Sequence, residues 1–295
     1  MNRLLSPTGD ILPASEGTLI YFASYLARTV RHSTIKLYLA AVRNLHMRSG
    51  FSDPVVDRPL LKKVLRGILR YRGSPRTLRQ PVTPRVLLNI RPVLKGQLSP
   101  RDFSMVWAAF TLAFFGFLRC SEFTYQGVHS FNSKFDLTTD CITFSPSLAC
   151  ARSISVLLKS SKTDVYRQGQ SLSIACCSSL LCPVSAMQQY FLLAQPCHGP
   201  LFYFQSGVLL TRSSVTKLLR DSARSAGLPY RSLKGHSFRI GAASTAAAAG
   251  LPDWLIKVLG RWSSDCYQLY IRTPESVLLS AAPRMASVSS NVFLG

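Results

Sequence analysis

Hydrophobic residues in the first part of the chain recur every three or four positions, which is the spacing of a helix with one buried face. One such segment begins after Thr18 and another after Ser33, and both hydroxyls can cap a helix. A third segment starts near Asp57, with Pro59 in its first turn. The pattern predicts a small, all-helical domain over residues 1–75.

The pattern becomes mixed in residues 83–295, where helical and strand-like segments follow one another. The longest uncharged apolar stretch, residues 103–118, has 16 residues. It falls short of the ~20 residues that span a bilayer, so it predicts a buried core helix. Alternating apolar and polar residues predict short antiparallel strands at residues 140–144, 153–159 and 171–175. The expected fold class is mainly α (α+β), with a helical N-terminal domain and a mixed domain that contains a small antiparallel sheet.

The stretch that joins the two domains is rich in turn-forming and basic residues. Residues 73–84, GSPRTLRQPVTP, include three prolines and one glycine, and every charge among them is positive. Clusters of proline and glycine interrupt regular structure. We therefore place a basic linker at residues 76–82, before a second domain at residues 83–295.

The chain carries 35 Lys and Arg against 13 Asp and Glu, for a formal net charge of +22. A compact protein with this charge repels itself, and a polyanionic partner such as nucleic acid or an anionic membrane is the usual explanation. Exposed helix faces normally mix charges, whereas residues 57–79 hold eight Lys or Arg and one acid, which favours contact with phosphates. The candidate DNA-binding residues are Lys62, Lys63, Arg66, Arg70, Arg76 and Arg79.

Cysteine usage bears on metals and on location. None of the eight cysteines forms a CxxC pair with a matching second pair, so we expect no metal site. The first residues show no secretory signal. We therefore expect a reducing compartment, either the cytosol or, for a eukaryotic protein, the nucleus.

The segment GHSFRIGAA contains a pair of residues suited to binding an anion. His236 and Arg239 are three residues apart, so on a helix they share one face. Ser237 could cap that helix and place its positive end beside the pair. Phosphodiester exchange without a metal needs such cations, a proton carrier and a nucleophile. The pair alone is also compatible with ordinary capping at a helix start.

Four sequence motifs occur along this chain in the same order as in a known protein family. HSFRIGAAS followed by LGRWSSDCYQLYIR resembles the HxxR…LGH…Y core of the phage-integrase-like tyrosine recombinases. FGFLRCSEF resembles the first arginine of that family, and LKSSKTDVYRQG resembles its β-hairpin lysine. The residues of the last motif, Trp-Ser-Ser and Tyr-Ile-Arg, are most similar to those of eukaryotic mobile-element recombinases of the DIRS/Ngaro or Crypton kind. The resemblance implies that residues 1–75 form a core-binding (SAM-like) domain and residues 83–295 a catalytic domain.

The resemblance implies a clamp on the scissile phosphate and an acid for the leaving group. Arg119 and Arg239 would hold the non-bridging oxygens, because a planar guanidinium binds two oxygens and stays charged. Glu122 would orient the site. Lys162, at the hairpin tip, would protonate the leaving 5′-oxygen, with Lys159 as the competing candidate.

The resemblance also implies a tyrosine nucleophile. Tyr270 would attack the phosphate to give a 3′-phosphotyrosine and a free 5′-hydroxyl, and His236 would exchange a proton with it. Tyr267 is the alternative nucleophile. Where the family has His or Trp, nine residues before Tyr270, this chain has Arg261, followed by Trp262. Arg261 can donate hydrogen bonds to phosphate but cannot shuttle a proton, and Trp262 could supply an indole donor instead.

These expectations describe a site-specific recombinase or integrase that cuts and rejoins double-stranded DNA with no cofactor and no small-molecule substrate. The resemblance also implies self-association as a dimer or tetramer on DNA. The departure at Arg261 leaves open a catalytically retired, transposon-derived DNA-binding protein. A type IB topoisomerase-like relaxing enzyme would use the same residues. A basic RNA-binding protein fits the charge but does not explain the order of the motifs.

Overall fold

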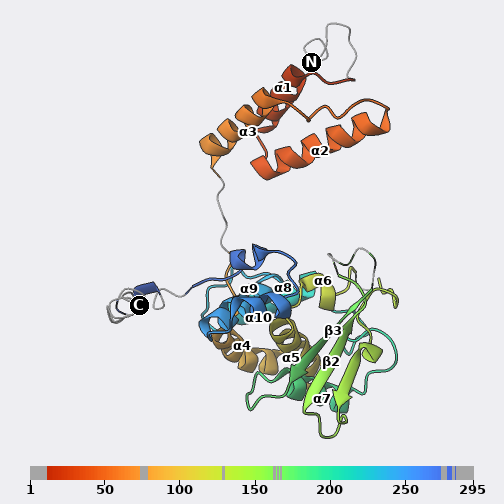
Figure 1. The fold of residues 1–295 in the computed structure, drawn as a ribbon. Coiled ribbons are helices and arrows are strands. Elements are labelled where there is room, and N and C mark those ends of the chain that lie inside the picture. Colours follow the sequence, from red (N-terminus) through yellow and green to blue (C-terminus); the bar gives the residue numbers. More distant parts are fainter. Residues whose placement is uncertain are drawn as a thin grey trace, which may run out of the picture. The chain divides into compact units, whose positions relative to one another are not determined.

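The computed structural model describes residues 12–73, 79–127, 130–161, 164, 166, 168–273, 278–280 and 283. The chain divides into two compact units, Met1–Thr77 and Leu78–Gly295, and each has its own hydrophobic core (Figure 1). In the described ranges, no helix has both the length and the apolar character needed to cross a membrane.

The described part of the N-terminal unit, residues 12–73, contains three helices: α1 (Glu16–Leu26), α2 (His32–Arg48) and α3 (Pro59–Arg72). Each helix turns one apolar face inward, as the spacing of its hydrophobic residues predicts. The buried core consists of Ala14, Leu19, Ala23, Ile35, Leu39 and Leu61.

The helix starts in this unit differ in part from those predicted. Ser15, rather than Thr18, caps α1, since the Ser15 hydroxyl accepts from the backbone N–H of Thr18 at 3.1 Å. Helix α2 begins one residue before Ser33 and has no side-chain cap. Helix α3 begins at Pro59, two residues after the predicted start near Asp57, and Pro59 lies in its first turn as predicted. The Glu16 carboxylate accepts from the N–H groups of Leu60 and Leu61, at 2.9 and 3.0 Å. A carboxylate of α1 therefore caps α3 and joins the two helices.

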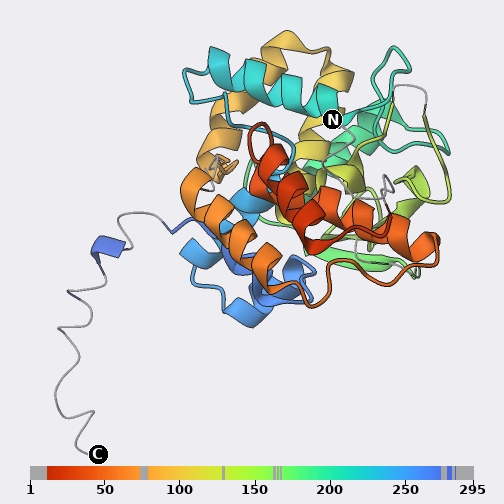
Figure 2. The same ribbon diagram turned by 90° about the horizontal axis from the view of Figure 1, so that it is seen from above.

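The C-terminal unit is mainly helical. Its helices and turns are α4 (Pro84–Gln97), α5 (Pro100–Phe115), α6 (Cys120–Phe123), η2 (Thr139–Cys141), α7 (Pro183–Ala194), α8 (Arg212–Ser225), α9 (Ser237–Ala248), α10 (Asp253–Leu259) and η3 (Asp265–Leu269). The hydroxyls of Thr83 and Ser99 cap α4 and α5. Helix α8 packs against α4 (Figure 2).

The three predicted strands are present and form a small antiparallel sheet. They are β1 (Ile142–Ser145), β2 (Ser153–Leu158) and β3 (Gln170–Ala175), in the order β1-β2-β3. Ile142 pairs with Val156, and Ser153 pairs with Ala175. Together with the helices, this sheet confirms the expected mainly α fold class.

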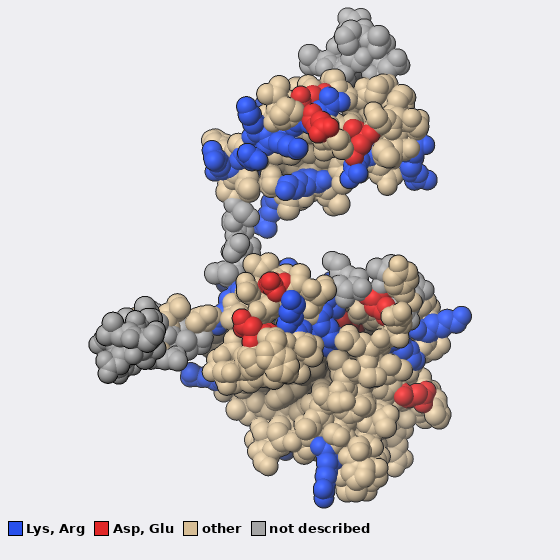
Figure 3. All heavy atoms as spheres, in the orientation of Figure 1, with Lys and Arg blue, Asp and Glu red and all other residues tan. Residues whose placement is uncertain are grey.

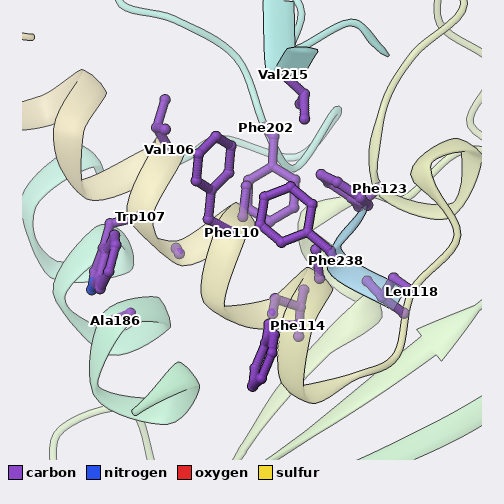
Figure 4. Close-up of a cluster of buried hydrophobic side chains, with 14 of the residues drawn as sticks. Val106, Trp107, Phe110, Phe114, Leu118, Phe123, Ala186, Phe202, Val215 and Phe238 are labelled. Atoms are coloured by element: carbon purple, nitrogen blue, oxygen red, sulfur yellow. The ribbon is translucent and has the colours of Figure 1, made fainter. Parts of the chain in front are cut away.

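The core of this unit fixes the start of α9. Helix α5 is buried on almost every side, which confirms the predicted core helix. The ring of Phe238 lies 4.9 Å from that of Phe110 on α5 and 6.2 Å from that of Phe123, measured between centroids (Figure 4). Since Phe238 stands between His236 and Arg239 in the sequence, its burial also fixes the positions from which these two residues project.

Helix α9 packs closely on the segment that enters the unit. A Cβ at Gly241 would lie 1.8 Å from the carbonyl oxygen of Val82, so only glycine allows this approach. The Val82 N–H donates to the carbonyl oxygen of Ser237 at 2.9 Å. The prediction that Ser237 caps α9 is wrong: His236 is the capping residue, and the Ser237 hydroxyl instead accepts from the N–H of Lys234 at 3.0 Å.

Candidate active site

The predicted site residues of the C-terminal unit come from elements that are far apart in the sequence. The ring centroid of Tyr270, at the end of η3, lies 5.2 Å from that of His236 and 5.2 Å from that of Trp262. The guanidinium carbon of Arg239 lies 4.3 Å from the Trp262 ring and 5.9 Å from the Tyr270 ring. An imidazole, an indole and a guanidinium therefore surround one tyrosine.

Arg239 is completely buried. Its Nη1 donates to the carbonyl oxygen of Phe117 at 2.6 Å, and its Nη2 donates to that of Gly260. Within the described residues, its Nε has no hydrogen-bond partner. Burial, followed by the nearby charge of Arg119, lowers the pKa of Arg239 to about 10, so the guanidinium is still a cation at neutral pH. A buried cation with an unused donor is suited to bind an anion.

Glu122 links two further arginines. Its side chain is 1% exposed, and Oε1 accepts from Arg119 Nη1 at 2.8 Å. Oε2 accepts from the Arg119 backbone N–H at 2.8 Å and from Arg261 Nη2 at 2.7 Å. A buried carboxylate is tolerated only with partners of this kind, and here it orients both guanidiniums. The Arg119 side chain keeps 17% of its surface exposed, which leaves it open to a ligand.

Arg261 and Trp262 are adjacent but point to different places. The Arg261 side chain is 4% exposed and binds Glu122 and a backbone carbonyl of the turn after α5. Its φ of 56° lies in the left-handed region, which is unfavourable for a residue with a Cβ by about 1–3 kcal/mol. Trp262 covers Gly260 so closely that a Cβ there would lie 1.6 Å from the indole. This turn directs the guanidinium toward Glu122 and the indole toward the tyrosine.

His236 is half-buried among positive charges. Burial lowers its pKa most, and the charges of Arg79, Arg239, Arg119 and Arg212 lower it further, from the ordinary 6.5 to about 4. The imidazole is therefore neutral at neutral pH. A neutral imidazole can accept a proton from a tyrosine hydroxyl, which an imidazolium cannot do.

The charge state of His236 gives a testable prediction. Its ring signals in an NMR titration should not shift between about pH 7 and pH 5, where a free histidine protonates. As the pH falls below 6.5, His236 takes up a proton in the unfolded chain, whereas in the folded protein it does so only near pH 4. The free energy of unfolding therefore decreases as the pH is lowered from 6.5 to about 4. His236→Gln identifies the signals and should weaken the pH dependence of stability. A midpoint near 6.5 for His236 would contradict the prediction.

The two candidate nucleophiles differ in their surroundings. Tyr267 is 4% exposed, and its ring centroid lies 6.1 Å from that of Trp262 in the core. Tyr270 is half-buried. The ring that lies beside the His236 imidazole is that of Tyr270.

A comparison with curated proteins shows what this chain is similar to. No protein-family model matches the sequence. The integrase/recombinase XerD homolog of Selenomonas ruminantium is 25% identical over 248 residues, which are 80% of this chain and 67% of that protein. This relative is an integrase/recombinase, so the chain is similar to the integrases and recombinases.

Two solved structures have the same fold as this recombinase over nearly its whole length. One is the XerH site-specific recombinase bound to palindromic difH substrate, with a TM-score of 0.61 and 13% identity over 95% of this chain and 72% of that one. The other is the Tn1549 transposon integrase in complex with transposon right-end DNA. It has a TM-score of 0.61 and 14% identity over 93% of this chain and 86% of that one.

Ser244 is a residue of the recombinase site that the sequence analysis missed. It lies on α9, the helix that carries Arg239, and it is buried. Its Oγ donates to the carbonyl oxygen of Tyr270 at 3.2 Å and accepts from the backbone N–H of Arg272 at 2.8 Å. Ser244 therefore binds the backbone at Tyr270 and at the second residue after it. The available signal was a polar residue within an Ala-rich helix, which no motif distinguishes from a packing residue.

We expect Ser244→Ala to slow covalent attachment to DNA without weakening DNA binding. Loss of one hydrogen bond that positions Tyr270 corresponds to roughly a tenfold lower rate. Single-turnover cleavage and equilibrium DNA binding, measured separately, check this. Thr245→Ala, at the next position of α9, is the matched control and should have little effect. Equal losses of cleavage and of affinity would argue against a positioning role for Ser244.

The predicted acid of the recombinase, Lys162, lies outside the described residues. The competing Lys159 is described, and its Nζ donates to the carbonyl oxygen of Ser133 at 2.8 Å and to the Thr138 hydroxyl at 2.8 Å. Both partners belong to the loop before β1. Lys159 is thus engaged in joining β2 to that loop, and the assignment of the acid to Lys162 stays a prediction.

The predicted DNA-binding residues of the N-terminal unit are all exposed on α3: Lys62, Lys63, Arg66 and Arg70. In Figure 3, Lys and Arg side chains are spread over much of the visible surface of this unit. Of the two linker candidates, Arg76 lies outside the described residues, whereas Arg79 is described and is exposed. Since Arg79 lowers the pKa of His236, its charge acts on the active site as well.

A surface hollow of about 680 Å³ lies beside the start of α8. It is lined by Gln126, Thr211, Arg212, Ser213, Thr216, Lys217, Arg220 and Asp221. Arg212, at the start of α8, also lowers the pKa of His236 and so links the hollow to the site. The sequence analysis missed this surface because the basic residues of α8 are interspersed with Asp221 and hydroxyl residues.

Proposed function

We propose that this recombinase cuts and rejoins duplex DNA at specific sites through a covalent bond between Tyr270 and a 3′-phosphate. One observation carries the proposal: a tyrosine, a neutral imidazole and a buried guanidinium with an unused donor converge on one place. This set supplies a nucleophile, a proton acceptor and a cation for phosphoryl transfer. The likeness to the XerD homolog supports the same function.

The phosphate is held by two arginines. Arg239 donates its free Nε–H to one non-bridging oxygen, and Arg119, held in place by Glu122, donates to the other. Trp262 lies against both the guanidinium of Arg239 and the nucleophile, so it is the better candidate for the position that the family gives to His or Trp. Arg261 acts on the phosphate site indirectly, through Glu122, because its side chain binds that carboxylate.

The proton follows a short path during cleavage. The Tyr270 hydroxyl gives its proton to the neutral His236, and the phenolate oxygen bonds to phosphorus. The bond from phosphorus to the 5′-oxygen breaks, and Lys162 supplies the proton that this oxygen takes up. Rejoining is the reverse: a 5′-hydroxyl attacks the phosphotyrosine and displaces Tyr270. The phosphoester bond energy is retained in the covalent intermediate, so the reaction uses no nucleotide.

Phosphate contacts beyond the active site supply affinity rather than sequence choice. We assign them to the exposed basic residues of α3, to the linker arginines and to the hollow beside α8. The expected setting is the rearrangement of mobile-element DNA, in the nucleus if the protein is eukaryotic and otherwise in the cytoplasm. The order of the sequence motifs and the likeness in fold to the Tn1549 transposon integrase support a mobile-element role.

Self-association on DNA is part of this proposal. The segment after Tyr270 exposes Leu278 and Leu279, at 63% and 70%. An apolar hollow of about 300 Å³ lies between α5, α9, α10 and β3, with Phe114, Leu251 and Leu259 among its lining residues. The side chains of Leu278 and Leu279 fit this hollow on a second copy of the chain. Sedimentation velocity with one-site and two-site duplexes should show assembly that Leu279→Asp prevents.

The proposal is tested with a suicide substrate. Binding sites are first selected from duplexes with a randomised core. The selected duplexes are then nicked near the cleavage position, so that cleavage releases a short fragment that carries the new 5′-hydroxyl and diffuses away. The wild-type protein should form an adduct that survives denaturing electrophoresis and is lost on protease treatment. A folded protein that binds the selected DNA but gives no adduct from any nick position would be a retired DNA-binding protein, and the proposal would fail.

A further inference from the structure

Two cysteine side chains meet where β3 ends and α7 begins, in a region that the recombination chemistry does not use. The sulfur of Cys176 lies 3.4 Å from the sulfur of Cys182, and both are free thiols. Cys176 follows the last residue of β3, and its N–H donates to the carbonyl oxygen of Arg152 at 2.7 Å. Cys182 is the capping residue of α7. Each cysteine is therefore directly adjacent to an element of regular structure, Cys176 to β3 and Cys182 to α7.

The surroundings of Cys182 favour its thiolate. Its sulfur accepts from the N–H of Cys177 at 3.3 Å and from that of Ser185 at 3.5 Å. It also stands at the positive end of a helix, where a negative charge is stabilised. Burial raises the pKa of the Cys182 thiol, but the hydrogen bonds from Cys177, Ser185 and Cys176 outweigh burial and lower the pKa to about 7. A substantial fraction of Cys182 is thus ionised at neutral pH.

The two thiols differ in access. Cys176 is exposed to solvent, whereas Cys182 is 2% exposed. A small reagent therefore reaches Cys176 first, while the Cys182 thiolate approaches the Cys176 sulfur from the protein side. The neighbouring Cys177 is exposed too. Partial desolvation of its thiol and the nearby Cys182 raise its pKa, so this thiol stays protonated at neutral pH.

We propose that Cys176 and Cys182 form a reversible dithiol site that exchanges with low-molecular-weight disulfides. The Cys176 thiolate attacks one sulfur of the small disulfide, breaks its S–S bond and releases one small thiolate. The Cys182 thiolate then attacks the Cys176 sulfur and displaces the second small thiolate. The protein loses two electrons and two protons, and the small disulfide becomes two thiols. The bond that forms ties the end of β3 to the first turn of α7.

The test uses the full-length protein under native conditions, with glutathione disulfide as the probe. After exchange, free thiols are alkylated, and peptides are mapped by mass spectrometry without reduction. The expected product is a peptide pair linked through Cys176 and Cys182, which a small dithiol reductant reverses. Because the wild-type protein is mapped directly, the result does not depend on whether any variant folds, and it is independent of strand cleavage.

Three variants sharpen the test. In Cys182→Ser, glutathione should stay attached to Cys176, because the resolving thiolate is missing. Cys176→Ser should give no bridge to Cys182, and Cys177→Ser, the matched control, should bridge as the wild type does. A wild-type protein that keeps glutathione on Cys176 without a bridge would overturn the proposal. So would a bridge between Cys177 and Cys182, or glutathione spread evenly over the exposed Cys150, Cys176, Cys197 and Cys266.

Discussion

Replacing Tyr270 with phenylalanine should abolish the covalent protein–DNA adduct while leaving the affinity for DNA unchanged. The variant keeps the ring that packs beside His236 and Trp262 and loses only the attacking oxygen. Removal of a nucleophile typically lowers the rate of catalysis on the order of 10⁴-fold or more. Adduct formation on the nicked substrate and equilibrium binding to the intact duplex measure the two quantities separately.

Tyr267→Phe is the matched control for this substitution. Tyr267 is 4% exposed and packs near Trp262, so its loss of a hydroxyl should affect stability slightly and leave adduct formation within a few-fold of wild type. The two variants differ by a single oxygen each, three residues apart. An adduct that survives Tyr270→Phe and disappears with Tyr267→Phe would move the nucleophile to Tyr267.

Glu122→Ala should destabilise the C-terminal unit more than any other single removal of a carboxylate from the part of the chain that the structure describes. The Glu122 side chain is 1% exposed and compensates the charges of Arg119 and Arg261. Removing one partner of a buried ion pair leaves the other charge uncompensated, which costs about 3–5 kcal/mol. Urea unfolding followed by circular dichroism gives the free energy of unfolding. Adduct formation should fall as well, because Arg119 loses the group that orients it.

Asp221→Ala provides the comparison for Glu122→Ala. Asp221 pairs with Arg224 at 3.0 Å, but their side chains are 40% and 61% exposed. Surface pairs of this kind contribute at most about 1 kcal/mol. A loss of stability in Glu122→Ala no greater than that in Asp221→Ala would show that the two arginines do not depend on Glu122.

The sequence analysis found the parts of the site that depend on residue type and short-range spacing. His236 and Arg239 are three residues apart on a helix start, and that spacing alone brings them to one face. Pro59 in a first helical turn likewise indicated the start of a helix near it. The three strands followed from alternation and the core helix from a long uncharged apolar run, so most of the fold could be predicted.

The parts that the sequence analysis missed depend on backbone geometry. The direction of Arg261 is set by a left-handed φ of 56°, which no spacing rule indicates. Counting back from Tyr270 therefore favoured Arg261, whereas the structure turns that side chain to Glu122 and brings Trp262 beside Tyr270. Ser244 was missed for a similar reason, since its role arises from a backbone carbonyl that lies 26 residues away in the sequence.

The most direct test of the account is the identity of the residue that becomes bonded to DNA. The adduct from the suicide substrate is digested with nuclease and protease, and the peptide that carries a nucleotide is sequenced by mass spectrometry. We expect a nucleotide that is joined through its 3′-phosphate to the side-chain oxygen of Tyr270. A nucleotide on Tyr267, or on another residue, would contradict it, and so would the absence of any adduct from a folded, DNA-bound protein.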